Sequence, residues 1–399
     1  MSDTPGAQVP GPLSHLHVLD LTVARAGPTC TRQLADMGAG VIHVASPRGG
    51  FLPGSDTHNL QRNKRSISID LKNAAGRDVF LRLADRADVV VENFRANVKH
   101  RLGIDYATLS ARNPRLVYAS ISGFGQDGPY ASRPGVDQIA QGMGGLMSVT
   151  GPPGSGPWRA GIAVSDTAAG TFLTQGILAA LIARDRTGRG QWVHTSLLES
   201  MINFMDFQAT RWLVDGEVPG QAGNDHPTVF PMGTFRTADG YINIAAMLRW
   251  DAFVEALGAT EIAADPRFAN FESRTKHRDA LMAACEARLV AKTTDEWVSI
   301  LNEAGLPCGP ILAVDEVFED PQVRHLEMAQ PVVHPVDGEL DLVRLPLTFS
   351  ETPASIRSAA PLLGADTERV LVEHGFAEAE IATLAGSGAI SLGSAAFDK

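Results

Sequence analysis

The stretch His17-Val18-Leu19-Asp20-Leu21 is a short, mostly apolar run with the length and composition of a buried β-strand. The same signal returns along the first half of the chain and predicts strands at 41–45, 66–70, 88–92, 116–121 and 191–196. Helical patterns lie between them, at 28–37, at 73–86 and from 166 to about 184. Apolar strands that alternate with helices form parallel sheets covered on both faces. We therefore expect an α/β fold with a doubly wound, Rossmann-like large domain, whose ligand crevice lies beyond the carboxyl ends of the strands.

The chain is long enough for two domains, since it has 399 residues, 44% of them apolar and 20% charged. A Gly/Pro-rich, polar stretch at 216–227 marks a domain boundary. We predict a large domain in residues 1–215, a linker and a smaller α+β domain in 216–320, and a return to the large domain in 321–399.

The second half of the chain carries a hairpin signal, 233–236 and 241–244 around Ala238-Asp239-Gly240. Helices are expected at 250–257, 274–291 and 294–303, after a long helix that starts near Leu197 and runs past Phe207. In the tail we expect a strand at 345–349, a helix at 365–374 and a frayed end over 386–399.

The bulk composition excludes several classes of protein. A formal net charge of −11 argues against a nucleic-acid partner. The three cysteines, Cys30, Cys285 and Cys308, are far apart and fit neither a disulfide framework nor a zinc site, so we expect no metal. The apolar run at 176–183 is too short to span a membrane, and the N-terminus lacks the pattern of a signal peptide. These features predict a soluble, cytoplasmic protein.

Asp166 stands at a predicted junction between a loop and a long apolar helix, within the stretch 158–170. Asp is a preferred N-cap residue, so a purely structural role is one interpretation. The other is a carboxylate nucleophile that the helix dipole keeps ionised near the ordinary pKa of about 3.9. The spacing alone does not decide between the two.

Glycines at 142–145 give a weak match to a dinucleotide-binding fingerprint, but they follow a helix instead of a strand. A dinucleotide-dependent oxidoreductase therefore stays an alternative that rests on the α/β layout alone.

Several phrases together resemble one family, the class III coenzyme A transferases, which also contain formyl-CoA transferase and α-methylacyl-CoA racemase. Their order and spacing cover almost the whole chain. The matching phrases are Ala26-Gly27-Pro28, 34–39 (LADMGA), 63–72 (NKRSISIDLK), 91–95 (VENFR), 122–125 (SGFG), 188–191 (GRGQ), 265–268 (DPRF), 305–310 (GLPCGP) and 319–322 (EDPQ).

This resemblance implies an α/β large domain, a small domain and two chains that interlock as a homodimer. It assigns the nucleophile to Asp166, with acyl-CoA and a free carboxylic acid as substrates and with no tightly bound cofactor, metal or ATP. In this reaction, backbone amides near Asp166 or Gly233 could hold oxyanions. The stretch 216–233 is either a lid that excludes water from the site or a plain interdomain linker. The CoA contacts that the resemblance implies are Ala24, Arg25, Ala26, Ile69, Leu71, Lys72, Asn93, Phe94, Arg95, Arg101, Val136 and Asp137.

Some positions depart from the family pattern. Formyl-CoA transferase has basic residues where this chain has Ser46 and Pro134, so those CoA contacts are in doubt. The racemase branch has a histidine at the position of Val136 and a glutamate near that of Leu248. Because a racemase needs an acid/base group on each face of the α-carbon, we expect a transferase, with the racemase as the alternative within the family.

Arg25 is a cation at a position where formyl-CoA transferase has a glutamine. If this loop faces the acyl group, the guanidinium can pair with a second carboxylate, which favours a dicarboxylic acid as substrate. The alternatives are that Arg25 binds a CoA phosphate or forms a salt bridge within the dimer.

Overall fold

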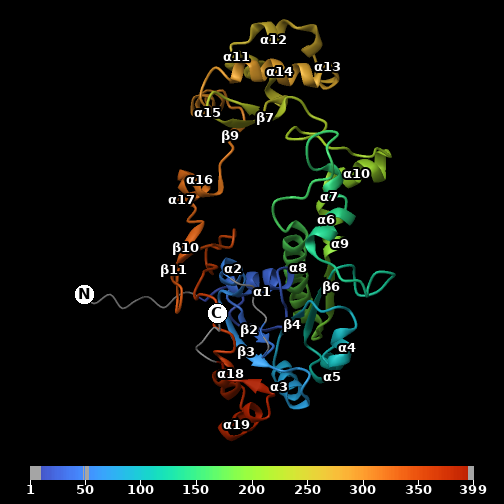
Figure 1. The fold of residues 1–399 in the computed structure, drawn as a ribbon, viewed down its shortest axis with the longest axis vertical. Helices are drawn as coiled ribbons and strands as arrows, with labels where there is room; N and C mark the ends of the chain where they lie inside the picture. The colour runs from blue at the N-terminus through green and yellow to red at the C-terminus, as the bar shows by residue number, and fades with distance from the viewer. Residues whose placement is uncertain (1–9, 48, 50–53, 394–399) are drawn as a thin grey trace, which may run out of the picture. The chain divides into compact units, whose positions relative to one another are not determined.

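The computed structural model describes residues 10–47, 49 and 54–393 (Figure 1). The chain separates into two compact units. The first contains residues 1–146, 160–213 and 324–399, and the second contains 147–159 and 214–323. The segment 147–159, which is rich in Gly and Pro, belongs to the second unit although it lies within the predicted large domain.

The first unit is built on a seven-stranded sheet with the order β12-β3-β2-β1-β4-β5-β6. Six of its strands are parallel, and their succession 3-2-1-4-5-6 is that of doubly wound dinucleotide-binding folds, which confirms the predicted α/β class. The strands are β1 (His17–Asp20), β2 (Gly40–Ala45), β3 (Lys64–Ile69), β4 (Val89–Glu92), β5 (Val117–Ser122), β6 (Trp192–Ser196) and the antiparallel β12 (Ile390–Ser391).

Helices cover both faces of this sheet because the central strands are apolar on both sides. Alternate residues divide between two cores: Val90 packs with Phe80 and Leu371, whereas Val89 packs with Leu34 and Leu173. The helices of the first core are α3 (Ala74–Ala84), α5 (Tyr106–Arg112), α18 (Thr367–Glu373) and α19 (Glu378–Gly386). Those of the second are α1 (Ala26–Asp36) and α8 (Val164–Thr187).

Helix α8 is the one helix among the described residues that is long and apolar enough to cross a membrane, judged by length and composition. Its residues Leu173 and Ile177 are buried against α1 and the sheet, as in a core helix. Gly170 allows the two helices to approach closely, because a Cβ there would lie 2.6 Å from the carbonyl oxygen of Ala26. The sequence therefore places the start of α8 tightly against α1.

The tail of the chain differs from the prediction in two places. No strand forms at 345–349, where Leu345 and Phe349 pack directly onto the second core and Pro346 lacks an N–H for sheet pairing. Instead, β10 (Ala329–His334) and β11 (Gly338–Val343) form an antiparallel hairpin. The predicted fraying from 386 is wrong as far as residue 393, because β12 pairs with β3; residues 394–399 lie outside the described part.

Asn63 ties the tail to the first unit. Its side chain donates to Asp36 and to the carbonyl of Ser355, and it accepts from the main-chain N–H groups of Arg357 and Ser358. Asn63 adopts a left-handed φ of 62°, which asparagine tolerates better than most residues. The polar phrase at 61–65 is therefore largely buried, and β3 begins at Lys64, two residues before the predicted strand.

The second unit has a three-stranded antiparallel sheet of β7 (Met232–Arg236), β8 (Tyr241–Ala245) and β9 (Cys308–Pro310), which includes the predicted hairpin. The predicted helix at 274–291 is in fact two helices. The helices of this unit are α11 (Trp250–Ala256), α12 (Thr260–Ala264), α13 (Phe271–Lys276), α14 (Arg278–Leu289), α15 (Thr294–Glu303) and α16 (Val314–Glu319).

The helix predicted from Leu197 onward is also interrupted. Asp206 has a left-handed φ of 45°, so the chain turns between α9 (Leu197–Phe204) and α10 (Asp206–Asp215). The remaining short helices are α2 (Ser55–Gln61), α4 (Val98–Leu102), α6 (Asp137–Met143), α7 (Leu146–Val149) and α17 (Pro321–His325).

Candidate active site

Asp166 lies in a small pocket of the first unit, with a volume of about 120 Å³. The pocket is formed where β1, β4 and β5 end, which is the edge of the sheet where the topology predicts a ligand. The residues around it are Ala24, Arg25, Ala26, Asn93, Ile121, Ser122, Gly123, Gly135, Val136, Asp166 and Leu197. The fold thus brings six of the predicted site residues, Ala24, Arg25, Ala26, Asn93, Val136 and Asp166, into one place.

Asn93 fixes the loop after β1. Its side chain accepts a hydrogen bond from the N–H of Val23 at 3.0 Å and donates to the carbonyl of Val23 at 2.7 Å. Ala24, the next residue, has a left-handed φ of 60°, which is uncommon for alanine. Since such strain persists only where the surroundings enforce it, the side chain of Asn93 holds Ala24 and Arg25 in a defined position beside Asp166.

Asp166 does not cap its helix, so that part of the prediction is wrong. Helix α8 begins at Val164, and Asp166 is its third residue. The cap comes from Asp137 on α6, which accepts hydrogen bonds from the N–H and the hydroxyl of Ser165 at 2.9 and 2.8 Å. The N–H groups of Val164 and Thr167 donate to carbonyl groups of the preceding turn. These N–H groups at the start of α8 are therefore occupied. Within the described residues, no N–H group donates a hydrogen bond to the carboxylate of Asp166.

The electrostatics of Asp166 also differ from the prediction. Its pKa is raised from the ordinary 3.8 to about 6, because burial and, to a smaller extent, the negative charge of Asp137 raise it, while Arg25 opposes both effects. The carboxylate is still largely ionised at neutral pH. Because it carries little hydration and accepts no hydrogen bond from the described residues, it is more basic and more nucleophilic than an ordinary aspartate.

Arg25 lies in the pocket but already has a partner in its own chain. Its guanidinium contacts the carboxylate of Asp56 on α2 at 2.5 Å, and both side chains are partly exposed. Because guanidinium has five N–H groups, an accessible arginine with this one ion pair within the described part of the chain retains donors for an anionic ligand.

A second pocket, of about 220 Å³, lies along the same edge of the sheet and includes four of the predicted CoA contacts, Ile69, Leu71, Lys72 and Phe94. Val23 and Phe94 border it, next to Ala24 and Asn93 of the first pocket. Most of its walls are apolar, and Ser46 lines it where formyl-CoA transferase has an arginine. Its chemistry suits an apolar or aromatic group beside one cation.

Three predicted CoA contacts do not join these pockets. Arg95 and Arg101 are exposed outside the two pocket linings. Asp137 is buried, and its carboxylate accepts hydrogen bonds from Ser165 and, at 2.7 Å, from the side-chain amide of Gln141. Asp137 therefore acts on the site indirectly: it caps the start of α8, and its negative charge raises the pKa of Asp166.

The sequence analysis missed two buried ion pairs at the same edge of the sheet. Asp20 accepts from the ammonium of Lys64 at 3.0 Å, and Glu92 accepts from that of Lys99 at 3.0 Å. Burial alone would raise the pKa of Asp20, but Lys64 together with His43 and Thr22 holds it well below its usual range. The signal that could have revealed them is the carboxylate that ends each apolar strand, at Asp20 and Glu92, because a buried charge requires a partner.

No cysteine offers a competing nucleophile. Burial raises the pKa of Cys30 and of Cys285 to about 12, and it also raises that of Cys308. Since the thiolate is the reactive form, these shifts disfavour all three thiols as nucleophiles at neutral pH.

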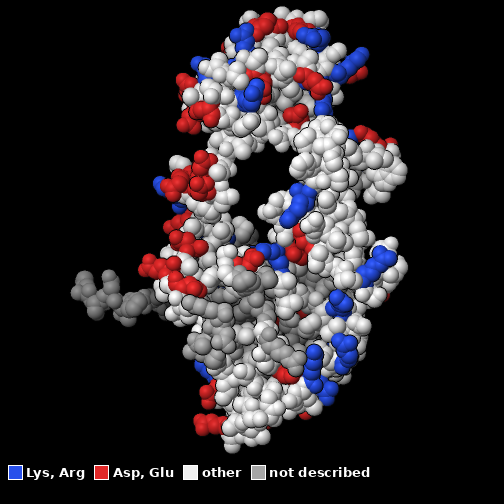
Figure 2. Space-filling view, viewed as in Figure 1, with Lys and Arg blue, Asp and Glu red and all other residues white. Residues whose placement is uncertain are grey.

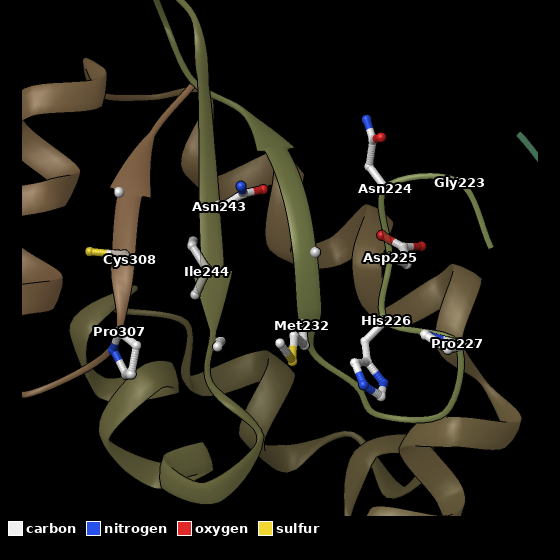
Figure 3. A pocket seen from close by; sticks show the side chains of 13 residues that line it. Gly223, Asn224, Asp225, His226, Pro227, Met232, Asn243, Ile244, Pro307 and Cys308 are labelled. Atoms are coloured by element: carbon white, nitrogen blue, oxygen red, sulfur yellow. The ribbon is translucent and has the colours of Figure 1, made fainter. Parts of the chain in front are cut away.

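The second unit has a larger pocket of its own, of about 540 Å³. Figure 3 shows the loop that carries Asn224, Asp225 and His226 beside β7, with Cys308 on β9. Gly233, considered above as an oxyanion donor, lines this pocket. Burial raises the pKa of Asp225, which favours its neutral form.

Known proteins that resemble this chain identify its family. The family described as CoA-transferase family III matches residues 13–367, so the chain belongs to that family and is a CoA-transferase. It is 36% identical over 386 residues to a succinyl-CoA:mesaconate CoA-transferase of Haloarcula hispanica, covering 92% of this chain and 97% of that one. It is 35% identical over 392 residues to a succinate–glutarate CoA-transferase of Agrobacterium fabrum, with coverages of 94% and 98%.

A solved structure supports the fold. A CaiB/BaiF family protein from Brucella suis superposes with a TM-score of 0.82 at 36% identity, over 92% of this chain and all of that one. The confirmed family sets aside the dinucleotide-dependent oxidoreductase.

Proposed function

We propose that this enzyme moves CoA from an acyl-CoA to a free carboxylic acid and that the carboxylate of Asp166 is the nucleophile. The observation that carries the proposal is the environment of this group: half-buried, with a pKa raised to about 6, in a pocket at the ligand edge of the sheet. The neighbouring apolar pocket, with Lys72 and Phe94, has the features that a CoA thioester requires.

The reaction proceeds by two exchanges on Asp166. Its carboxylate attacks the thioester carbonyl, the C–S bond breaks, and a mixed anhydride and CoA thiolate form. The thiolate then attacks the aspartyl carbonyl, which releases the first acid with one oxygen from Asp166 and leaves an aspartyl-CoA thioester. The second acid attacks this thioester and repeats the steps in reverse, which restores the carboxylate. One thioester replaces another, so the exchange consumes neither ATP nor a redox equivalent.

The composition of the pocket favours this chemistry over racemisation. Val136 lines the pocket where the racemase branch has its histidine, and Leu248 is 85% exposed in the second unit. Asp166 is the one acid/base side chain among the pocket-lining residues near neutral pH, whereas a racemase needs two.

We further infer that the acceptor is a short dicarboxylic acid, with its second carboxylate held by Arg25. The cation lies in the same pocket as Asp166, and Asp56 is its one ion-pair partner among the described residues. Two relatives are named for mesaconate, succinate and glutarate, all dicarboxylic acids. Loss of a charged hydrogen-bond pair costs roughly 1.5–3 kcal/mol, so Arg25→Gln should raise KM for diacids by about 10-fold or more and leave monoacids nearly unchanged. Equal effects on both would refute this role.

We also propose a homodimer that works in the cytoplasm. Helix α10 has no buried residue and exposes Trp212 and Leu213 by 56% and 79%, a pattern typical of a surface that a partner covers. Light scattering of the purified protein tests the mass; a monomer at micromolar concentration would contradict the proposal.

Hydroxylamine tests the nucleophile, since it traps anhydrides and thioesters. With acyl-CoA present it should inactivate the enzyme and convert Asp166 to a hydroxamate, and without acyl-CoA it should do neither. Asp166→Asn should be inactive, whereas Asp185→Asn, an exposed aspartate on the same helix, should retain activity. Modification at another residue would overturn the assignment.

A further inference from the structure

His58, His334 and Asp337 form a cluster that the proposed reaction does not use. His58 belongs to α2, His334 ends β10, and Asp337 lies in the turn between β10 and β11. Their potential ligand atoms all lie within 4.8 Å of one another, and the two imidazole rings meet edge to face with centroids 4.8 Å apart. Two segments that are far apart in the sequence, α2 and the β10–β11 hairpin, thus converge at one point of the first unit.

The contacts in this cluster call for a cation. Oδ2 of Asp337 lies 2.8 Å from Nδ1 of His334 and 3.2 Å from Nε2 of His58. Nδ1 of His334 also accepts from the main-chain N–H groups of Asp337 and Val336, at 3.1 and 3.4 Å. Nδ1 of His58, the other nitrogen of the His58 ring, is buried and has no hydrogen-bond partner among the described residues. The cluster thus gathers one carboxylate and two imidazoles whose ring nitrogens can bind a cation.

The donor set agrees with a transition metal. Ligands at about 2.0–2.2 Å from a tetrahedral Zn²⁺ lie roughly 3.3–3.5 Å from one another, so the two separations, 2.8 and 3.2 Å, would open slightly around the ion. Two imidazoles and one carboxylate suit Zn²⁺, Co²⁺ or Ni²⁺ better than Mg²⁺ or Ca²⁺, which prefer oxygen ligands.

The burial of the cluster leaves Asp337 as the side from which a cation can enter. The side chains of His334 and His58 are 4% and 14% exposed, whereas that of Asp337 is 49% exposed. Glu339 and Asp341 on β11 are exposed as well, and Figure 2 shows acidic side chains gathered over the β10–β11 hairpin. An entering cation would pass this acidic surface, and water would complete its coordination.

We propose that His58, His334 and Asp337 bind one divalent transition-metal ion, which fastens the tail hairpin to helix α2. The same helix carries Asp56, the partner of Arg25 in the pocket of Asp166. The metal site is therefore structural. By holding α2 in place it also positions Asp56, and through Asp56 it positions Arg25. The inference does not depend on the proposed reaction, because it rests on residues outside both pockets.

The test uses full-length protein without an affinity tag, stripped of metal by a chelator and titrated with Co²⁺. We expect one equivalent to bind with the visible spectrum of a low-symmetry, four- or five-coordinate site, and Zn²⁺ to displace it. Zn²⁺ should also raise the thermal midpoint, since a ligand that binds only the folded state stabilises it.

Two ligand variants and one control complete the experiment. Loss of an outer-shell partner alone costs about 10–100-fold in metal affinity, so His58→Gln and Asp337→Asn, which remove a ligand, should each cost about 100-fold or more. His325→Gln, an exposed histidine of the same tail, should change nothing. Absence of saturable binding, or equal affinity in all variants, would show that the cluster is an ion pair only.

Discussion

The two charged neighbours of Asp166 should move its pH dependence in opposite directions. Asp137 raises the pKa of Asp166 and Arg25 lowers it, while burial, the largest effect, is common to all variants. Removing the charge of Asp137 should therefore shift the acid limb of the rate profile to lower pH, and removing that of Arg25 should shift it to higher pH. Few structural perturbations would produce this pair of signs by accident.

The size of each shift follows from the fraction of ionised nucleophile. With a pKa of about 6, about a tenth of Asp166 is ionised at pH 5. A nearby charge changes a pKa by about one pH unit or more, so Asp137→Asn should ionise about half of it and raise the rate at pH 5 about fivefold. Because Asp166 stays buried in this variant, the pKa that the acid limb of the rate profile reports should stay above the ordinary value of 3.8. Arg25→Gln should lower the rate at pH 6 by a similar factor.

The assay is kcat/KM for the acyl-CoA at saturating acid, from pH 4.5 to 8, because this quantity reports the free enzyme. A phosphate monoester of CoA titrates near pH 6, but identically for every variant, so the differences belong to the protein. Arg25→Lys keeps the charge, and Ser165→Ala removes a hydrogen bond of Asp137 without changing charge. Both controls should keep the limb near pH 6. Shifts of the same sign in Asp137→Asn and Arg25→Gln, or none in folded variants, would refute the electrostatic account.

Three other outcomes are expected. Because the pKa of Asp166 is raised, its protonated carboxyl stabilises the fold below pH 3.8, and this stabilisation is lost as pH rises through about 6. In urea unfolding, the free energy of unfolding of Asp166→Asn should therefore exceed that of the wild type by up to roughly 3 kcal/mol at pH 7 and by about nothing at pH 4. Gly170→Ala should cost about 1–3 kcal/mol in the same assay, because its Cβ would meet the backbone of Ala26; unchanged stability would contradict the close packing. Lys72→Ala should raise KM for acyl-CoA, and less so at high salt; an effect equal at all salt concentrations would argue against a phosphate contact.

The elements that the sequence predicted well are those whose pattern is local. The parallel strands are continuous apolar runs because both of their faces are buried, and their order places the pocket where the topology predicts it. The tail was harder to predict. The run from Leu345 to Phe349 has the apolar pattern of a strand, but it buries these two side chains without pairing in a sheet. No local pattern distinguishes these two ways of burying an apolar run.

The site shows the same limit. Asp166 has the residue type and the position of an N-cap, yet Asp137, 29 residues earlier in the chain, takes that role. The same contact brings a second negative charge close enough to raise the pKa of Asp166. Arg95 and Arg101 matched the family phrases, but both side chains are exposed outside the two pockets: Arg95 lies in the loop after β4, and Arg101 lies on the short helix α4. Distances between segments, which the sequence does not contain, decide these roles.

The transfer of oxygen from the acceptor acid tests the nucleophile most directly. Trypsin releases residues 160–184 as one peptide, and Asp166 is its one acidic side chain. When the enzyme turns over with an acceptor whose carboxylate carries ¹⁸O, each cycle removes one oxygen of the nucleophile and replaces it with one from the acceptor. This peptide should therefore gain about 2 Da after one cycle and approach a gain of about 4 Da after many, and fragmentation should place the label on Asp166. A peptide that keeps its natural mass after many turnovers would contradict the covalent role of Asp166.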